Sequence, residues 1–483
     1  MKKNNVIKNY LYNLSYQILA IVIPLITTPY LSRVLGAENI GIYSYTLSIT
    51  TYFILFGSLG VAMYGQREIA YFQDNIEKRS KTFWEIFIMR GITLAFSTII
   101  FYFSFCIRGQ YQVYYKILIL EIFANFIDIS WYFQGLEEFK KTVLRNMLVK
   151  LISVILVFIL VKKANDLNKY FLIYVFSNVI GNLSLWIYLP KFIRKIKILD
   201  LQILKHVKPT IMLFIPQIAI QIYTILDKTM IGIIVSDKSE VGYYEQAQKM
   251  IKLLLTIATS FGMVMMPRVA ATFAKGNNKQ VQEYMNKSIS FISLITFPLM
   301  FGIISISYKF VPIFYGNGYE KVAPLLCIIS PIIIFIGFSS IIGNQYLLPT
   351  KQQGKYTFSV IIGAIVNFIL NLILIKLLKS FGASIATVIA EFVVTFTQFV
   401  LVRKEISIFN VIKSIYKYII ASIIMFMISI CLGYFIKNNL ISIIVQVISS
   451  ILVYLVVILL VKDKMVFEGI NMIKNKFLKV KEK

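Results

Sequence analysis

The sequence predicts an all-α polytopic membrane protein with about 14 transmembrane helices, arranged as two six-helix lobes plus two C-terminal helices. Three observations support this fold class. Of the 483 residues, 58% are hydrophobic and 15% are charged, whereas soluble domains carry about a quarter charged residues. The apolar residues gather in windows of about twenty, the length that crosses a bilayer as a helix. Lys and Arg lie mainly in short runs between these windows.

The apolar windows define the expected spans in chain order. The first window follows Lys2, Lys3 and Lys8. It is too long for a signal peptide and lacks a small-residue cleavage site, so we expect a retained first span. The windows cover residues 10–35, 41–64, 82–107, 113–135, 143–161, 170–189, 210–235, 241–266, 284–307, 322–348, 356–375, 383–402, 412–436 and 440–461.

The loop charges predict the orientation of these spans. An even number of spans places both termini on one side of the membrane. The N-terminus, alternate loops and tail carry roughly 33 Lys and Arg against about 11 in the other loops, which predicts that both termini are cytoplasmic. The net charge of +28 is explained by such loops facing anionic lipid, and it requires no nucleic-acid partner.

A weak internal repeat predicts the domain organisation. Residues 17–43 resemble residues 217–244 at an offset of about 200, as a six-span unit duplicated without inversion would, and such parallel repeats place the substrate path between the two copies. Apolar residues at helical spacing among basic ones predict surface helices in the linker and the tail. The expected parts are an N-terminal six-helix lobe (1–190), a basic amphipathic cytoplasmic linker (191–209), a C-terminal six-helix lobe (210–402), two additional spans (403–463) and a basic amphipathic cytoplasmic tail (464–483).

Two carboxylates interrupt the fourth window. Glu121 and Asp128 are seven residues apart, so they share one face of a continuous helix. A charge near mid-membrane costs roughly 2.5–3.5 kcal/mol, which predicts that this face points toward protein or water. Arg90 and Lys150 lie at nearly the same depth as Asp128, and we expect at least one ion pair there. The pair either holds the first lobe together or acts in transport.

A second set of charges lies in the seventh and eighth windows. Asp227 and Lys228 are adjacent, and Glu245, Lys249 and Lys252 share one face at i, i+4 and i+7. Lysines at this depth need a polar or watery region, which predicts an aqueous, cationic cavity. A cationic cavity suits an anionic substrate, because Lys and Arg form charge-assisted hydrogen bonds to phosphate. Pairing with acids on neighbouring helices is the alternative.

Two further charges allow two interpretations each. Arg33, near the outer end of the first span, is either a cavity residue or an interfacial anchor. Glu391, near the middle of the twelfth span, either binds a coupling ion, H⁺ or Na⁺, or pairs within the second lobe.

The sequence offers no catalytic, metal or cofactor site. Cys106, Cys327 and Cys431 lie in apolar surroundings without ligand spacing, and His206 is the single histidine. A phosphate-binding Gly-rich loop is absent, so the chain has no ATPase of its own. We therefore expect no enzyme and no cofactor, and transport would depend on an ion gradient, the membrane potential or consumption of the substrate.

Two segments carry a family resemblance. Residues 29–43 (PYLSRVLGAENIGIY) and 128–140 (DISWYFQGLEEFK) resemble the signatures of bacterial polysaccharide flippases. These are the Wzx-type members of the multidrug/oligosaccharidyl-lipid/polysaccharide exporter superfamily. The resemblance implies a V-shaped pair of lobes around a central cationic cavity, in the cytoplasmic (inner) membrane of a bacterium.

The same resemblance implies a substrate. It is an undecaprenyl-diphosphate-linked oligosaccharide, turned to the outer leaflet by alternating access for surface polysaccharide assembly. The diphosphate would meet Lys249, Lys252, Arg33 and Lys228, the sugars would enter the cavity, and the polyprenyl tail would stay in lipid. Further partners implied are membrane lipids, H⁺ or Na⁺ as the coupling ion, and a polysaccharide polymerase.

Other functions remain open at this point. A lipid II flippase or an ion-coupled multidrug exporter would have the same fold, although the lysines of the eighth window count against an exporter of organic cations. A membrane-embedded polysaccharide polymerase or glycosyltransferase is the alternative of another class. Such enzymes usually carry a large outer loop, and the outer loops expected here are short.

Overall fold

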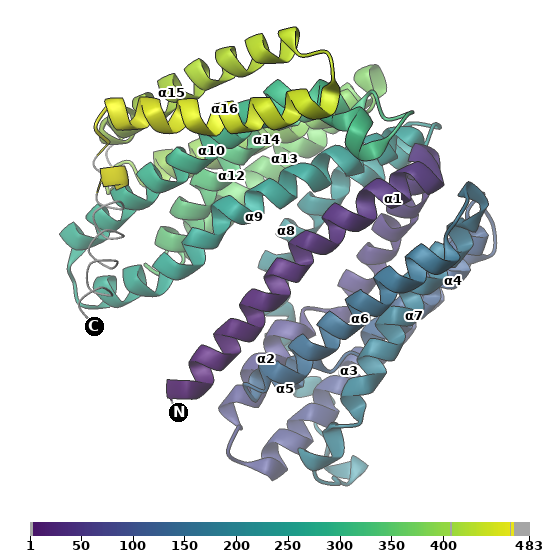
Figure 1. The fold of residues 1–483 in the computed structure, drawn as a ribbon. Helices are drawn as coiled ribbons and strands as arrows, with labels where there is room; N and C mark the ends of the chain where they lie inside the picture. Colours follow the sequence, from purple (N-terminus) through teal and green to yellow (C-terminus); the bar gives the residue numbers. More distant parts are fainter. Residues whose placement is uncertain (1–2, 406–407, 464, 468–483) are drawn as a thin grey trace, which may run out of the picture. The chain divides into compact units, whose positions relative to one another are not determined.

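The computed structural model describes residues 3–405, 408–463 and 465–467, and every regular element of these residues is a helix (Figure 1). This confirms the predicted fold class. Ten helical segments of the described chain are long and apolar enough to cross a membrane. One of them, Ile18–Tyr71, covers the first predicted window from residue 18 onward and the whole of the second. Three windows lie outside these ten segments. The windows at 210–235 and 241–266 are helical, and the window at 113–135 forms two helices, α4 and α5, separated at residues 127–129.

The chain divides into two compact units, Met1–Gly242 and Tyr243–Lys483. In the first unit, α3, α4, α6 and α7 run side by side (Figure 1). The predicted lobe, linker and tail boundaries stay predictions. The helices of the first unit are α1 (Lys3–Ser58), α2 (Val61–Tyr71), α3 (Ile76–Phe101), a π-helical turn (Tyr102–Cys106), α4 (Gln112–Phe126), α5 (Ser130–Gly135), α6 (Phe139–Leu160), α7 (Leu167–Trp186) and α8 (Val207–Ile234).

The second unit is built around α10, which packs on α11, α12, α15 and α16. The last two helices pack closely on each other, as Figure 1 shows. Its elements are α9 (Ser239–Ala274), which begins in the first unit, α10 (Asn278–Tyr315), α11 (Val322–Ile329), α12 (Ile332–Ser339), a π-helical segment (Ser340–Leu347), α13 (Gln353–Leu378), α14 (Ser380–Leu401), α15 (Ile408–Phe435) and α16 (Asn439–Leu460).

Glycines with positive φ mark the ends of the first two spans. Gly36 has φ 76° and ψ 169°, which breaks α1 between the first and second predicted windows. Gly60 has φ 73° and ψ 18° and stands directly before α2. Glycine adopts such angles without the steric cost that a Cβ brings. The long α1 therefore consists of two helical segments that meet at Gly36.

The linker differs from the continuous surface helix predicted for it. Between Leu189–Lys191 and α8 it forms only two short 3₁₀ turns, Ile198–Asp200 and Ile203–His206. Helix formation in water-exposed segments is marginal, and here side chains of α3 and α5 offer the backbone other partners. Arg194 N donates to Ser80 Oγ (2.9 Å), Gln202 N donates to Glu85 Oε1 (2.7 Å), and Phe192 O accepts from Tyr132 Oη (2.8 Å). The helix predicted in the tail falls almost entirely outside the described residues.

Candidate functional site

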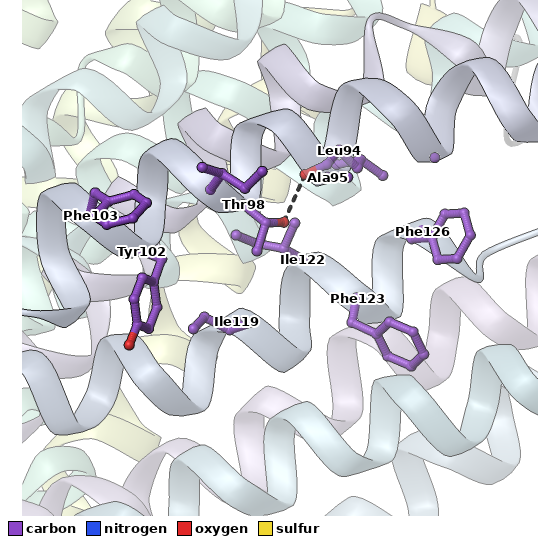
Figure 2. Close-up of a pocket in the computed structure, with 11 residues that line it drawn as sticks. Leu94, Ala95, Thr98, Tyr102, Phe103, Ile119, Ile122, Phe123 and Phe126 are labelled. Carbon is purple, nitrogen blue, oxygen red and sulfur yellow. Dashed lines mark hydrogen bonds between the residues drawn. The ribbon is translucent and has the colours of Figure 1, made fainter.

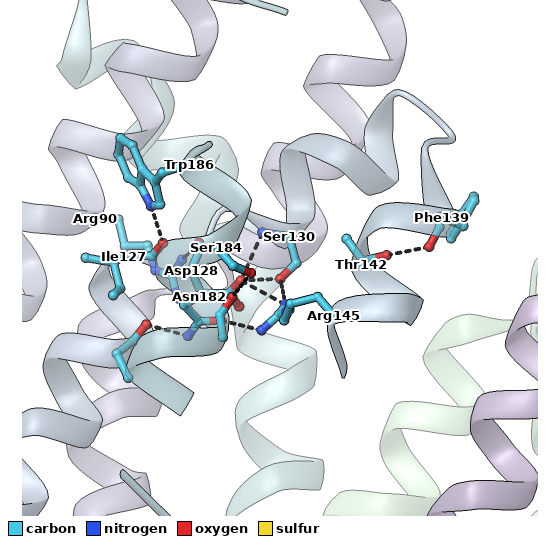
Figure 3. A network of polar contacts seen from close by, with 12 residues as sticks. Arg90, Ile127, Asp128, Ser130, Phe139, Thr142, Arg145, Asn182, Ser184 and Trp186 are labelled. Carbon is cyan, nitrogen blue, oxygen red and sulfur yellow. Dashed lines mark hydrogen bonds and ion pairs between the residues drawn. The ribbon is translucent and has the colours of Figure 1, made fainter. Parts of the chain in front are cut away.

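The fourth span is broken where its second carboxylate lies. Helix α4 ends at Phe126, and α5 begins at Ser130. A helix break frees backbone carbonyls, and where these are buried, protein groups have to bind them. Side chains of α3 and α7 do so (Figure 3): Arg90 Nη1 donates to Asp128 O (2.8 Å), Trp186 Nε1 to Ile127 O (2.8 Å) and Asn182 Nδ2 to Ala124 O (2.7 Å).

The Asp128 carboxylate holds the start of α5. Its Oδ1 accepts hydrogen bonds from the backbone N–H of Ser130 (2.9 Å) and from the Ser130 hydroxyl. Arg145 Nη2 lies 3.9 Å from the same oxygen and donates to Ser130 Oγ (2.9 Å). Arg145 Nη1 donates to Asn182 Oδ1 (2.5 Å), which links α6 to α7 (Figure 3). This Asp128–Arg145 network connects α5, α6 and α7 beside the break.

The geometry differs in two respects from the sequence expectation. Asp128 lies beyond the end of α4, so it does not share a helix face with Glu121. Arg90 reaches the backbone carbonyl of Asp128, whereas the ion pair of the carboxylate is with Arg145. Lys150 is half-buried on α6, five residues after Arg145. Neither proline nor glycine lies at residues 127–129, so the sequence offered no signal for the break.

Glu121 lies buried on α4 and contacts α7. Asn178 Nδ2 donates to its Oε1 (3.1 Å) and to its Oε2 (3.0 Å). Asn178 and Asn182 are one turn apart on α7, and together they connect that helix to Glu121 and to the broken end of α4. Neither asparagine was predicted as a site residue. Their i, i+4 spacing in an apolar window was the available signal.

Helix α9 carries the predicted basic residues on a different face from the one that packs against the protein. Tyr244, Ile251 and Ala258 are fully buried and form one stripe. On a separate face, Glu245 and Lys249 are half-buried and Lys252 is exposed. The predicted set at i, i+4 and i+7 thus lies on one continuous helix and shares a face that is less buried than the packing stripe.

The remaining predicted cations and acids are spread over both units. Arg33 is exposed on α1, where Nη1 donates to Pro29 O (3.5 Å). On α8, Asp227 is buried and Lys228 is half-buried. Glu391 is buried on α14 in the second unit. Lys249 and Lys252 belong to the second unit, whereas Arg33 and Lys228 belong to the first, so a joint substrate site stays a prediction.

A large apolar recess lies between α3 and α4 and is shown in Figure 2. Its volume is about 620 Å³, and its walls include Leu94, Tyr102, Ile119 and Phe123. The hydroxyl of Thr98 is occupied, because it donates to Leu94 O (2.7 Å). Such walls suit hydrocarbon and offer little to a sugar or a diphosphate. We therefore do not assign the polar part of a substrate to this recess.

Comparisons with protein families give two matches. A family described as polysaccharide biosynthesis protein matches residues 6–273, and the MatE family matches residues 213–377. An Escherichia coli K12 protein named as an O-antigen transporter is 27% identical over 390 residues, which are 80% of this chain and 93% of that protein. A Bacillus subtilis protein named lipid II flippase MurJ is 28% identical over 162 residues, or 33% of this chain and 29% of that protein.

Solved structures share the fold. A lipid II flippase MurJ in an inward closed conformation aligns with a TM-score of 0.76 and 18% identity, covering 94% of this chain and 99% of that one. An inward-facing multidrug resistance transporter of the MATE family aligns with a TM-score of 0.61 and 15% identity, covering 83% of this chain and 94% of that one. At these identities the likeness concerns the fold alone.

Proposed function

This chain belongs to the polysaccharide biosynthesis protein family, whose match spans residues 6–273, and we propose that it is a flippase for lipid-linked oligosaccharides. Its substrate would be an undecaprenyl-diphosphate-linked repeat unit, moved across the cytoplasmic membrane for surface polysaccharide assembly. The observation that carries the proposal is the alignment with the named O-antigen transporter, which extends over 80% of this chain. It would act as a transporter and not as an enzyme.

The proposed mechanism is alternating access around a cationic cavity. Lys249 and Lys252 stand on a face of α9 apart from its buried stripe, which supports a role in binding rather than in packing. With Arg33 and Lys228 they would bind the diphosphate through charge-assisted hydrogen bonds, each worth about 1.5–3 kcal/mol. The sugars would occupy the cavity, and the polyprenyl tail would remain in the lipid.

The charged residues around the break between α4 and α5 stabilise the first lobe in this proposal. Asp128, Arg145 and Arg90 bind the groups that the helix break exposes, and this use supports stabilisation of the first lobe over direct contact with substrate. Glu121, Lys150, Asp227, Glu245 and Glu391 complete the proposed intramembrane charge network. Both termini would lie in the cytoplasm of a bacterium. Coupling to H⁺ or Na⁺ and association with a polysaccharide polymerase are parts of the proposal that rest on the resemblance.

The proposed substrate-binding role of Lys249 and Lys252 on α9 can be tested in cells. Lys249→Ala combined with Lys252→Ala should abolish export of surface polysaccharide, while the amount of protein in the membrane stays unchanged. The matched control is Lys275→Ala with Lys279→Ala, which removes two exposed lysines close to the junction of α9 and α10. Export should persist in the control. Undiminished surface polysaccharide in the Lys249/Lys252 variant would remove the cavity proposal.

A lipid II flippase is the second candidate. The partial sequence match with the Bacillus subtilis protein named lipid II flippase MurJ favours this candidate. Expression in cells depleted of their lipid II flippase separates the two functions. Rescue of growth would support lipid II as the substrate. Rescue of surface polysaccharide in a strain lacking its own polysaccharide flippase, without rescue of growth in the depleted cells, would support the first proposal.

A further inference from the structure

A polar cavity lies in the first unit where α2, α3 and the end of the linker meet. Its volume is about 480 Å³, and its walls include Tyr64, Glu68, Lys78, Lys81, Lys205 and His206. Cavities of about 300–1,000 Å³ are the size that holds small ligands. The proposed transport function does not use this cavity, and none of the residues predicted for substrate binding contributes to it.

A buried polar cluster builds one wall of the cavity. Glu85 is fully buried on α3, and its carboxylate accepts from Gln202 N (2.7 Å) and from Lys205 Nζ (2.8 Å). Nε2 of His206 lies 2.9 Å from Glu85 Oε2, and Nδ1 lies 2.7 Å from the Tyr64 hydroxyl. These bonds attach the end of the linker to α2 and α3. The wall therefore holds Lys205 in place at the cavity.

The charge of the cavity favours an anion. Glu68 pairs with Arg67 (2.9 Å), and Lys205 pairs with Glu85 (2.8 Å), so the charges of these groups are balanced locally. Lys78 and Lys81 take part in none of the ion pairs formed among the described residues. Two ammonium groups thus give the cavity an excess of positive charge. Lysine binds phosphate oxygens through charge-assisted hydrogen bonds.

Exposed apolar and aromatic side chains flank the cavity. Leu204 precedes Lys205 and is 84% exposed, and Tyr71, at the end of α2, is 71% exposed. Exposed apolar and aromatic side chains beside lysines are typical of segments that enter the interface of a bilayer. Basic residues at that depth attract anionic lipid, each by about 1 kcal/mol. A phosphate presented by lipid would reach this cavity without leaving the membrane surface.

We propose that this cavity binds a phosphate group, contributed by the headgroup of an anionic phospholipid. Lys78 and Lys81 contact the phosphate oxygens, and Lys205, fixed by Glu85, contributes a third ammonium group at the edge. A soluble phosphate has the same chemistry, and the experiment distinguishes the two sources. The site is separate from the α9 face proposed for the transported substrate, so either proposal can fail alone.

Binding to the purified full-length protein in a neutral detergent tests the proposal. Short-chain phosphatidylglycerol, short-chain phosphatidylcholine and inorganic phosphate are titrated separately, and binding is followed by the change in melting temperature. We expect saturable stabilisation by phosphatidylglycerol and none by phosphatidylcholine. Lys78→Gln with Lys81→Gln should weaken the apparent affinity about thirtyfold, since two ammonium contacts are lost. The variant Lys78→Arg with Lys81→Arg keeps both positive charges and should retain binding. Retained binding shows that substitution at these two positions leaves the site folded.

Matched charge removal elsewhere provides the control. Lys275→Gln with Lys279→Gln removes two exposed lysines that do not line the cavity. The affinity of this double variant for phosphatidylglycerol should stay within about twofold of that of the unaltered protein. Saturable binding of inorganic phosphate that depends on Lys78 and Lys81 would support the phosphate chemistry with a soluble source. Equal weakening in both double variants, or no effect of phosphatidylglycerol and phosphate on the unaltered protein, would overturn the proposal.

Discussion

At the scale of single residues, Arg145 is the side chain that the sequence analysis missed. It pairs with Asp128, hydrogen-bonds Ser130 and Asn182, and so connects α5, α6 and α7. If the fourth span were one unbroken helix, Arg90 and Lys150 would lie at nearly the same depth as Asp128, and they were therefore the predicted ion-pair partners. The break moves Asp128 off that helix and toward the start of α6. Asp128 and Arg90 were predicted as charged site residues, whereas the pairing of Asp128 with Arg145 depends on the backbone geometry of the break.

Removing one member of this network should destabilise the protein. Arg145→Ala removes the ion-pair partner of the Asp128 carboxylate and the hydrogen bond that Arg145 donates to the Asn182 amide oxygen. We expect a loss of about 1–3 kcal/mol, measured as a lower melting temperature in detergent. Asp128→Asn should have a similar effect, and the double variant should cost less than the sum because the two residues share one interaction. Strictly additive effects would show that the two side chains act independently.

His206 makes stability depend on pH. Burial lowers the pKa of His206 below its ordinary value, against the raising effect of Glu85 beside it. The folded protein therefore favours the neutral imidazole ring. The stability that depends on the neutral ring is fully present above about pH 6.5, the ordinary pKa of histidine, and is lost as the pH falls through the lowered pKa of the folded state. Because it is the single histidine of the chain, His206→Gln should remove the part of the stability change that occurs in this window. An unaltered pH profile of melting temperature in His206→Gln would contradict this assignment.

At the scale of elements, the helical windows were predictable because apolar stretches of about twenty residues have few alternatives in a membrane. The linker was not, since Ser80, Glu85 and Tyr132 provide its backbone with partners that lie far away in the sequence. The close approach of Gly41 and Gly242 could not be predicted from the sequence either. The two glycines occupy matching places in the predicted repeat, and a Cβ built on Gly41 would lie 3.0 Å from Gly242 N.

The backbone of α1 lies so close to residues 238–242 that neither Gly41 nor Gly242 can be replaced by a residue with a side chain. A Cβ at Gly41 would lie 1.7 Å from Lys238 O, and one at Gly242 would lie 2.1 Å from Ala37 O. Both neighbours are backbone atoms, so α1 would have to move. Gly41→Val should therefore lower the amount of folded protein and its melting temperature, as measured by fluorescence-detected size exclusion. Gly302→Ala on α10, where a Cβ meets no atom within 4 Å, is the control and should behave as the unaltered protein.

At the scale of the whole molecule, the all-α fold and the membership of the family agree with the sequence expectations. Composition and window length were sufficient for the fold because a chain this apolar must satisfy its backbone inside helices. The candidate site was predictable only in part. Lys249 and Lys252 share a face of α9 as their spacing required, whereas the helix break around Asp128 and the polar cavity near His206 arise from contacts between distant segments.

The proposed flippase activity can be measured as transport of a lipid-linked glycan by the purified protein. The protein is reconstituted into liposomes that carry an undecaprenyl-diphosphate-linked oligosaccharide in both leaflets, and a lectin or glycosidase outside the vesicles reports the accessible fraction over time. We expect the accessible fraction of the glycan to rise beyond the outer-leaflet fraction with the unaltered protein, but not with Lys249→Ala/Lys252→Ala. Accessibility that stays at the level of protein-free vesicles, although the reconstituted protein is folded, would contradict the claim that this protein is a flippase for such lipids.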